Sequence, residues 1–212
     1  MNQQPTQPAS RVSLDALAPG FADPVHDTQA VFRALLDALA RPGSIGTIET
    51  PLPAADANGV ARAGLAACAS LLALCDYATP VWLAQPDPAL AAALRFHADA
   101  PFAASAADAA FVYVHDAAAL PPLDVFHCGT PESPETSATV LVRVDALTGG
   151  APLTLSGPGI DGTRTIAPAG LLTRFWPERA ALAPLFPCGL DFYLVCGASL
   201  IGLPRTTHVE IR

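Results

Sequence analysis

Two glycine-containing segments carry the residue types best suited to binding an anion. The first, Ser156-Gly157-Pro158-Gly159, follows an apolar stretch, and Arg164 lies a few residues farther along the chain. The glycines allow backbone N–H groups to turn toward a negatively charged group. The alternative is a tight turn between two strands. The segment is not a nucleophile elbow, because the G-x-S-x-G pattern would require glycine where Thr154 stands.

The second segment, Gly202 to His208, places an arginine and two hydroxyl side chains after another apolar stretch. Arginine is the side chain whose shape best matches bidentate contact with phosphate or phosphonate. The alternative is a solvated edge at which Arg205 pairs with a carboxylate. Our hypothesis is that both segments, with help from the end of the first helix, hold an anionic group. The residues of this candidate site are Arg41, Ser156, Gly157, Gly159, Arg205 and Thr206.

Other groups of reactive side chains give weaker signals. His26 and Asp27 suit acid–base chemistry, although the same residues can cap and flank a helix. The remaining histidines lack the spacing of metal ligands, and the five cysteines include no C-x-x-C pair. We therefore expect reduced, structural cysteines and no metal or iron–sulfur cluster.

The composition excludes several classes of protein. The 11 basic residues are all arginine, so no lysine is present to form a Schiff base with pyridoxal phosphate or to complete a Walker-type phosphate loop. A net charge of −8 without a basic block argues against binding to nucleic acid or to an anionic membrane. The polar first ten residues lack a secretory core, and the longest apolar run, Leu65–Cys75, is too short to span a bilayer. We expect a cytoplasmic protein.

Apolar periodicity predicts helices that must position these segments. The first carries an apolar face and is followed by Arg41-Pro42-Gly43, with Asp23 or Asp27 as its cap. The second is apolar almost all round, which predicts burial. We expect residues 1–20 to be flexible and residues 21–212 to form a single α/β domain. The predicted helices are Val25–Arg41, Ala61–Cys75, Pro88–Phe96 and Ala169–Leu182, the last with a kink at Pro177.

Strands are predicted where short apolar runs lie between turn residues. Several runs are continuously apolar, as in strands covered on both faces. The turn Cys196–Ser199 predicts a hairpin between the last two. Together these elements indicate a three-layer αβα sandwich with a mixed sheet. The predicted strands are Ser44–Ile48, Pro80–Leu83, Ala110–His115, Thr139–Val144, Pro152–Ser156, Arg164–Ala167, Asp191–Val195 and Leu200–Leu203.

Three blocks of sequence, taken in order, resemble one family. They are Gly20–Gly43, Leu153–Ile160 and Phe186–Thr207, and the resemblance extends from Gly20 to Arg212. The chain is similar to the PhnH family, the H subunit of bacterial carbon–phosphorus lyase, which acts in phosphonate utilisation. The order and spacing of the blocks make the resemblance specific.

The resemblance implies a fold similar to that of the pyridoxal-phosphate-dependent transferases, and a homodimer that joins the G, I and J subunits. With the I, G and L proteins, such a subunit supports transfer of an alkylphosphonate to the ribose C1′ of ATP, which releases adenine. The J subunit then cleaves the carbon–phosphorus bond with S-adenosylmethionine and an iron–sulfur cluster. The absence of lysine and of ligand-spaced cysteines agrees with a chain that carries no cofactor itself.

Two hypotheses about function remain open. In the first, the chain is a structural and binding subunit of the complex with no activity alone. In the second, it is a stand-alone anion- or nucleotide-binding protein with a catalytic site at its dimer interface. An exposed apolar surface favours the first hypothesis. A pocket that collects Arg41, Ser156 and Arg205 favours the second.

Overall fold

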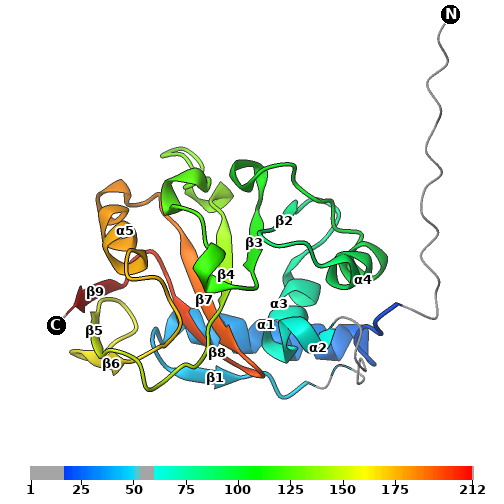
Figure 1. Ribbon diagram of the computed structural model, residues 1–212, viewed down its shortest axis with the longest axis horizontal. Helices are drawn as coiled ribbons and strands as arrows, with labels where there is room; N and C mark the ends of the chain where they lie inside the picture. The colour runs from blue at the N-terminus through cyan, green and yellow to red at the C-terminus, as the bar shows by residue number, and fades with distance from the viewer. Residues whose placement is uncertain (1–16, 51, 53–59, 212) are drawn as a thin grey trace, which may run out of the picture.

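The computed structural model describes residues 17–50, 52 and 60–211, so most of the predicted flexible terminus lies outside the described residues. The described chain is built around a six-stranded mixed sheet (Figure 1). Four neighbouring strands run parallel to one another. The fifth is antiparallel to them, and the last is antiparallel to the fifth. The prediction of an α/β fold with a mixed sheet is confirmed. In spatial order the strands are β2 (Val81–Leu83), β3 (Phe111–Val114), β4 (Thr139–Arg143), β7 (Asp191–Cys196), β8 (Ser199–Leu203) and β1 (Ile45–Thr47).

A second, antiparallel sheet of three strands lies beside the first. Its order is β6 (Arg164–Ile166), β5 (Leu153–Ser156) and β9 (His208–Ile211). All eight predicted strands are present, and the predicted hairpin joins β7 to β8. Strand β9 was not predicted. Its four residues alternate polar and apolar types, as a strand with one covered face does, but so short a pattern gives little signal.

The first helices follow the predicted positions closely. Helix α1 (Pro24–Ala40) begins after Asp23, whose side chain accepts from the N–H groups of Val25 and His26. The predicted second helix is divided at Gly64 into α2 (Val60–Ala63) and α3 (Leu65–Leu74). Helix α4 (Pro88–Ala98) begins at the predicted residue and extends beyond the predicted end at Phe96. Throughout the described ranges, every helix is too short or too polar to cross a membrane.

The prediction for the last helix was wrong in length. Helix α5 spans Phe175–Ala181 and does not begin at Ala169. The backbone of Ala169 is used elsewhere, because its N–H donates to the carbonyl of Ala146 at 2.9 Å in an isolated β-bridge. Pro177, where a kink was expected, lies in the first turn of α5, where a backbone N–H has no helical partner.

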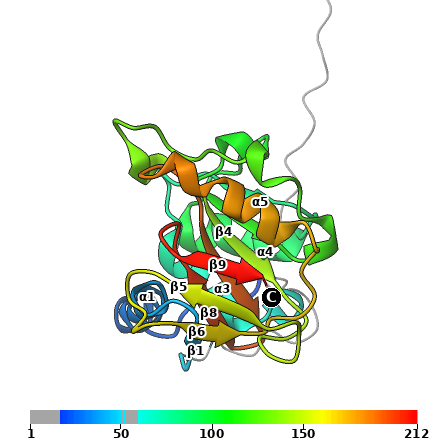
Figure 2. The ribbon, with the colours of Figure 1, turned by 90° about the vertical axis from the view of Figure 1, so that its left-hand side faces the viewer.

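The strands of the large sheet bury side chains on both faces. Helices α1 and α3 cover one face, where Tyr193 of β7 donates a hydrogen bond to the carbonyl of Leu35 at 3.1 Å. The small sheet and α5 lie over the other face, against residues such as Val142 and Phe192 (Figure 2). The third layer therefore combines a sheet with a helix, which the sequence analysis did not anticipate.

At Gly202, the backbone of α1 approaches β8 so closely that a side chain does not fit between them. A Cβ atom on Gly202 would lie 2.5 Å from the carbonyl oxygen of Ala38 in α1. By contrast, a Cβ on Gly46 of the neighbouring strand β1 would have its nearest contact at 3.9 Å. The contact between helix and sheet thus depends on glycine at one strand position and not at the next.

We expect Gly202→Ala to lower the free energy of unfolding by about 1–3 kcal/mol or more, because the added methyl group must displace helix backbone. Gly46→Ala is the matched control, and we expect it to change stability by less than about 0.5 kcal/mol. Urea unfolding followed by circular dichroism measures both. Equal stability of the two variants would contradict the assigned packing.

Candidate functional site

The glycine-containing turn after β5 lies between two other segments of backbone. The N–H of Ile160 donates to the carbonyl of Gly157 at 3.2 Å and closes the turn. Gly157 has φ +128°, and a Cβ there would lie 2.9 Å from the carbonyl oxygen of Thr206. Gly159 has φ +81°, and its Cβ would lie 2.1 Å from the carbonyl oxygen of Ala40. Both positions require glycine, because of the positive φ and because of the close contact.

An arginine holds the end of α1 against this turn. The side chain of Arg164, on β6, donates from Nη1 to the carbonyl of Arg41 at 3.1 Å and to that of Pro42 at 2.7 Å. These contacts satisfy carbonyl groups that follow the last turn of the helix. The three blocks of sequence that carry the family resemblance therefore meet at one junction, formed by the end of α1, the turn after β5 and the segment before β9.

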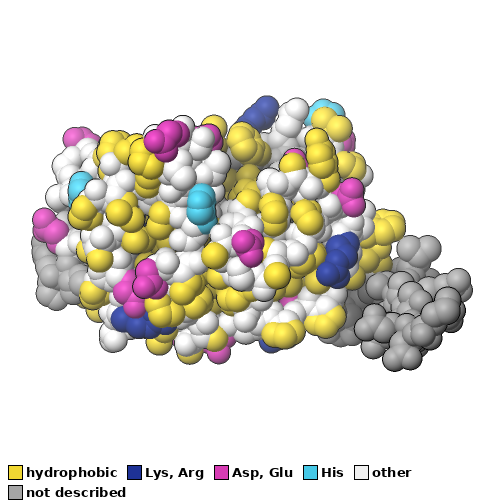
Figure 3. Space-filling view, turned by 90° about the horizontal axis from the view of Figure 1, so that it is seen from above, with side chains coloured by type: hydrophobic (Ala, Val, Ile, Leu, Met, Phe, Trp, Pro, Cys, Tyr) yellow, Lys and Arg dark blue, Asp and Glu magenta, His cyan; other side chains and the backbone are white. Residues whose placement is uncertain are grey.

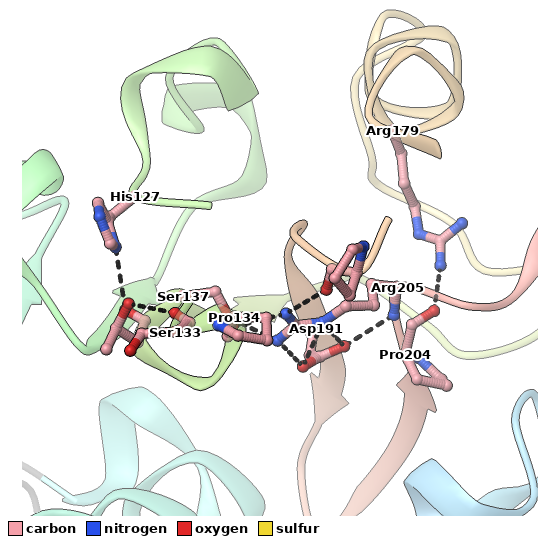
Figure 4. A network of polar contacts seen from close by, with 10 residues as sticks. His127, Ser133, Pro134, Ser137, Arg179, Asp191, Pro204 and Arg205 are labelled. Atoms are coloured by element: carbon pink, nitrogen blue, oxygen red, sulfur yellow. Dashed lines mark hydrogen bonds and ion pairs between the residues drawn. The ribbon is translucent and has the colours of Figure 1, made fainter. Parts of the chain in front are cut away.

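The side chain of Arg205 is held by the protein itself (Figure 4). Its Nη2 lies 2.7 Å from Asp191 Oδ2, and the backbone N–H of Arg205 donates to Asp191 Oδ1 at 2.7 Å. Its Nη1 donates to the carbonyls of Pro134, at 2.9 Å, and Pro187, at 3.2 Å, and its Nη2 also donates to the hydroxyl of Ser137. Both side chains of the ion pair are less than one-fifth exposed, at 18% and 19%.

A second arginine secures the same turn from the other side. Arg179 of α5 donates to the carbonyls of Thr207, at 2.8 Å, and Pro204, at 2.7 Å. Burial lowers the pKa of Arg179 to about 10, with a smaller opposing effect of Asp191. Its Nε and the hydroxyl of Thr207 are buried and have no hydrogen-bond partner among the described residues. Two guanidinium groups thus fix the backbone on either side of Thr206.

The structure brings together only part of the predicted anion site. Ser156, Gly157, Gly159 and the backbone of Thr206 lie at the junction. The side chain of Arg41 instead pairs with Asp37 on the surface of α1, where it is 63% exposed. The guanidinium of Arg205 points to Asp191 and Ser137, which is the carboxylate pairing considered as the alternative. The binding of an anion by these six residues stays a prediction.

The other reactive side chains have structural partners. Asp23, not Asp27, caps α1, while Asp27 Oδ2 accepts from the N–H of Asp23 at 3.0 Å and completes a capping box. Burial raises the pKa of the Cys68 and Cys75 thiols to about 12, which keeps both protonated. Within the described ranges, no group of three or more His, Cys, Asp or Glu is placed to hold a metal ion. The expectation of a metal-free chain stays a prediction.

Sequence reasoning missed a cluster at the opposite edge of the large sheet. His115 and Arg143 lie at the ends of β3 and β4, and Arg62 of α2 reaches the same imidazole. The signal was present in the sequence, because a polar residue directly follows each apolar strand. In α/β proteins, ligands bind outside the carboxyl ends of the parallel strands.

Comparison with known proteins gives consistent matches. Residues 19–210 match the family described as bacterial phosphonate metabolism protein (PhnH). The chain is 41% identical over 199 residues to the alpha-D-ribose 1-methylphosphonate 5-triphosphate synthase subunit PhnH of Rhizobium meliloti (strain 1021). The aligned residues cover 90% of this chain and 94% of that protein. It is 38% identical over 84 residues to the putative C-P lyase subunit protein HtxG of Stutzerimonas stutzeri, which covers 40% of this chain and 43% of that protein.

We expect Asp191→Asn to lower the free energy of unfolding by about 2–4 kcal/mol, because it leaves the Arg205 guanidinium largely buried without its counter-charge. The matched control is Asp37→Asn, which removes an exposed ion pair with Arg41 and should leave the urea midpoint nearly unchanged. Urea unfolding of both variants tests the difference. A midpoint for Asp191→Asn equal to that of the parent would show that the pair does not secure the turn.

Proposed function

Because the chain belongs to the PhnH family, we propose that it is a subunit of the carbon–phosphorus lyase system for the catabolism of organic phosphonates. In this role it supports the formation of ribose 1-phosphonate 5-triphosphate from ATP and an alkylphosphonate. The observation that carries the proposal is the likeness to the Rhizobium synthase subunit along nearly the whole of both chains. All three blocks that carry the resemblance also meet at one junction of the fold.

The arrangement of side chains favours assembly over stand-alone catalysis. Arg41 and Arg205 have separate protein partners, so their side chains do not converge with Ser156 as a catalytic pocket at this point would require. Large apolar side chains remain exposed on one face of α1, with Phe32 at 49% and Leu36 at 56%. Figure 3 shows another face, on which hydrophobic side chains are spread widely with charged side chains among them. Such surfaces are typical of chains that work in contact with others.

The finer features implied by the family are part of the same proposal. The chain forms a homodimer, joins the G, I and J subunits, and works in the cytoplasm. Its fold is related to that of the pyridoxal-phosphate-dependent transferases, but with no lysine it cannot hold that cofactor as a Schiff base. We propose that it binds no cofactor of its own. The second candidate function, an anion- or nucleotide-binding protein with a catalytic site at its dimer interface, is separated from the first by the next experiment.

We expect adenine release from ATP to depend on both methylphosphonate and this chain when the purified G, I and L proteins are present. Chromatography of the products measures adenine. The chain alone should release none, because Arg41 and Arg205 are each paired with a carboxylate and do not converge with Ser156 on a substrate. Release by the G, I and L proteins without this chain would contradict the proposed role. Release by this chain alone would favour the stand-alone alternative.

The homodimer has its own test. Light scattering at micromolar concentration should give twice the chain mass of 21.8 kDa, since the exposed apolar side chains of α1 and neighbouring surfaces require cover. Dilution should not change the mass until the dissociation constant is approached. A mass of one chain at micromolar concentration would contradict the homodimer and leave the family assignment unaffected.

A further inference from the structure

Three strands of the large sheet deliver polar residues to one edge. β2 is followed by Gln85, β3 by His115, and β4 ends with Arg143. Because these strands are parallel, their carboxyl ends lie at the same edge of the sheet. Helix α2 lies beside this edge and contributes Arg62. The side chains of Arg62, His115 and Arg143 form what we call the edge cluster.

Both arginines of the edge cluster approach a single imidazole nitrogen. Arg62 Nε lies 3.3 Å from His115 Nε2, and Arg143 Nη1 lies 3.2 Å from the same atom. Arg143 Nη1 also donates to the carbonyl of His115 at 3.2 Å. A neutral imidazole nitrogen offers one lone pair, so two guanidinium donors compete for it. Most of the ten N–H groups on the two arginines consequently have no acceptor within the part of the chain that the structure describes.

The other side of the imidazole fixes its tautomer. Tyr113 is buried, and its hydroxyl donates to the carbonyl of Ala63 at 3.3 Å. The same hydroxyl lies 3.1 Å from His115 Nδ1 and, because its own hydrogen is used at Ala63, accepts a hydrogen bond from Nδ1–H. Nε2 is then the unprotonated nitrogen that faces the arginines. Burial and the charges of Arg143 and Arg62 lower the pKa of His115, with smaller opposing effects from Asp87 and Asp116.

Among the described residues, the edge cluster has no acidic side chain in direct contact. No carboxylate of the described ranges lies within 4.0 Å of Arg62 or Arg143. By contrast, Arg205 pairs with Asp191 at 2.7 Å. Two acidic residues whose charge acts on His115, Asp87 and Asp116, each cap a helix with one carboxylate oxygen, while Asp87 Oδ2 is buried with no hydrogen-bond partner among the described residues. Asp87 Oδ1 accepts from the N–H of Leu90, and Asp116 Oδ1 accepts from that of Ala118. Two exposed guanidinium groups are therefore held together without a contacting carboxylate in the part of the chain that the structure describes.

We propose that the edge cluster binds a tetrahedral phosphorus oxyanion, the group shared by phosphates and phosphonates. The guanidinium groups are close enough for one such group to bridge them, and arginine suits it because its N–H donors match two oxygens at once. Gln85 adds a further donor at the same edge. Its Oε1 accepts from the N–H of His115 at 2.8 Å, and its buried Nε2 has no partner among the described residues.

Bound anion also changes the role of His115. A negative charge beside the imidazole favours its protonated form, so the pKa of His115 rises on binding. The protonated Nε2 then becomes a donor to the anion, in place of an acceptor shared by two arginines. Binding is thus coupled to proton uptake and strengthens as the pH falls through the titration range of His115.

Calorimetric titration of the purified full chain at pH 7 tests the site, with methylphosphonate and inorganic triphosphate as separate probes. We expect at least one probe to bind, and Arg62→Gln and Arg143→Gln each to weaken it by about tenfold or more, as the loss of a charge-assisted hydrogen bond does. Arg33→Gln, an exposed position on α1, is the control for net charge. Tighter binding of methylphosphonate identifies the phosphonate as the ligand, and tighter binding of triphosphate identifies a polyphosphate.

Failure to bind either probe, or equal weakening by Arg33→Gln, would overturn the proposal. A second measurement follows the imidazole protons by NMR, with His115→Gln to assign the signal, and should show a higher pKa for His115 at saturating probe. An unchanged pKa would also overturn it. These tests need neither the partner subunits nor adenine release, so their outcome is independent of that of the proposed function.

Discussion

At the C-terminal end of α1, backbone packs directly against backbone. The carbonyl of Ala38 faces Gly202 of β8, and the carbonyl of Ala40 faces Gly159. The side chain of Arg164 donates hydrogen bonds to the next two carbonyls, those of Arg41 and Pro42. This contact joins the helical layer to both sheets at one point, so the orientation of α1, the turn after β5 and the segment before β9 depend on one another. Glycine is required here for lack of space, and a Cβ at either glycine would separate the layers.

Arginine provides the polar connections that complete this frame. Arg164, Arg179 and Arg205 all donate to backbone carbonyls of turns, and Arg205 also pairs with Asp191. A guanidinium group can reach several acceptors in fixed directions, whereas an ammonium group is a compact point charge. These three arginines hold turns of the backbone in place, whereas Arg62 and Arg143, which meet at His115, are exposed.

The sequence predicted the strands well, because apolar runs between turn residues depend on local pattern alone. It failed for β9, which is short, and for the start of α5, because Ala169 pairs with a residue distant in the sequence. For the candidate site, the glycine spacing correctly indicated segments that meet. The direction of Arg205 was decided by Asp191 and Ser137, whose proximity arises only from strand register. Polar residues after the parallel strands were the overlooked signal.

The two edges of the large sheet consequently differ in kind. At the amino ends of the parallel strands, Asp191 and Arg205 form a largely buried ion pair, whose guanidinium also donates to Pro134, Pro187 and Ser137. At the carboxyl ends, Arg62 and Arg143 are exposed and share one imidazole nitrogen. Saturated hydrogen bonds resist rearrangement, while unsatisfied donors held in place keep their capacity for a ligand. A subunit that is rigid at one edge and unsaturated at the other is suited to hold an anionic group in a fixed position while the reacting groups are supplied from elsewhere.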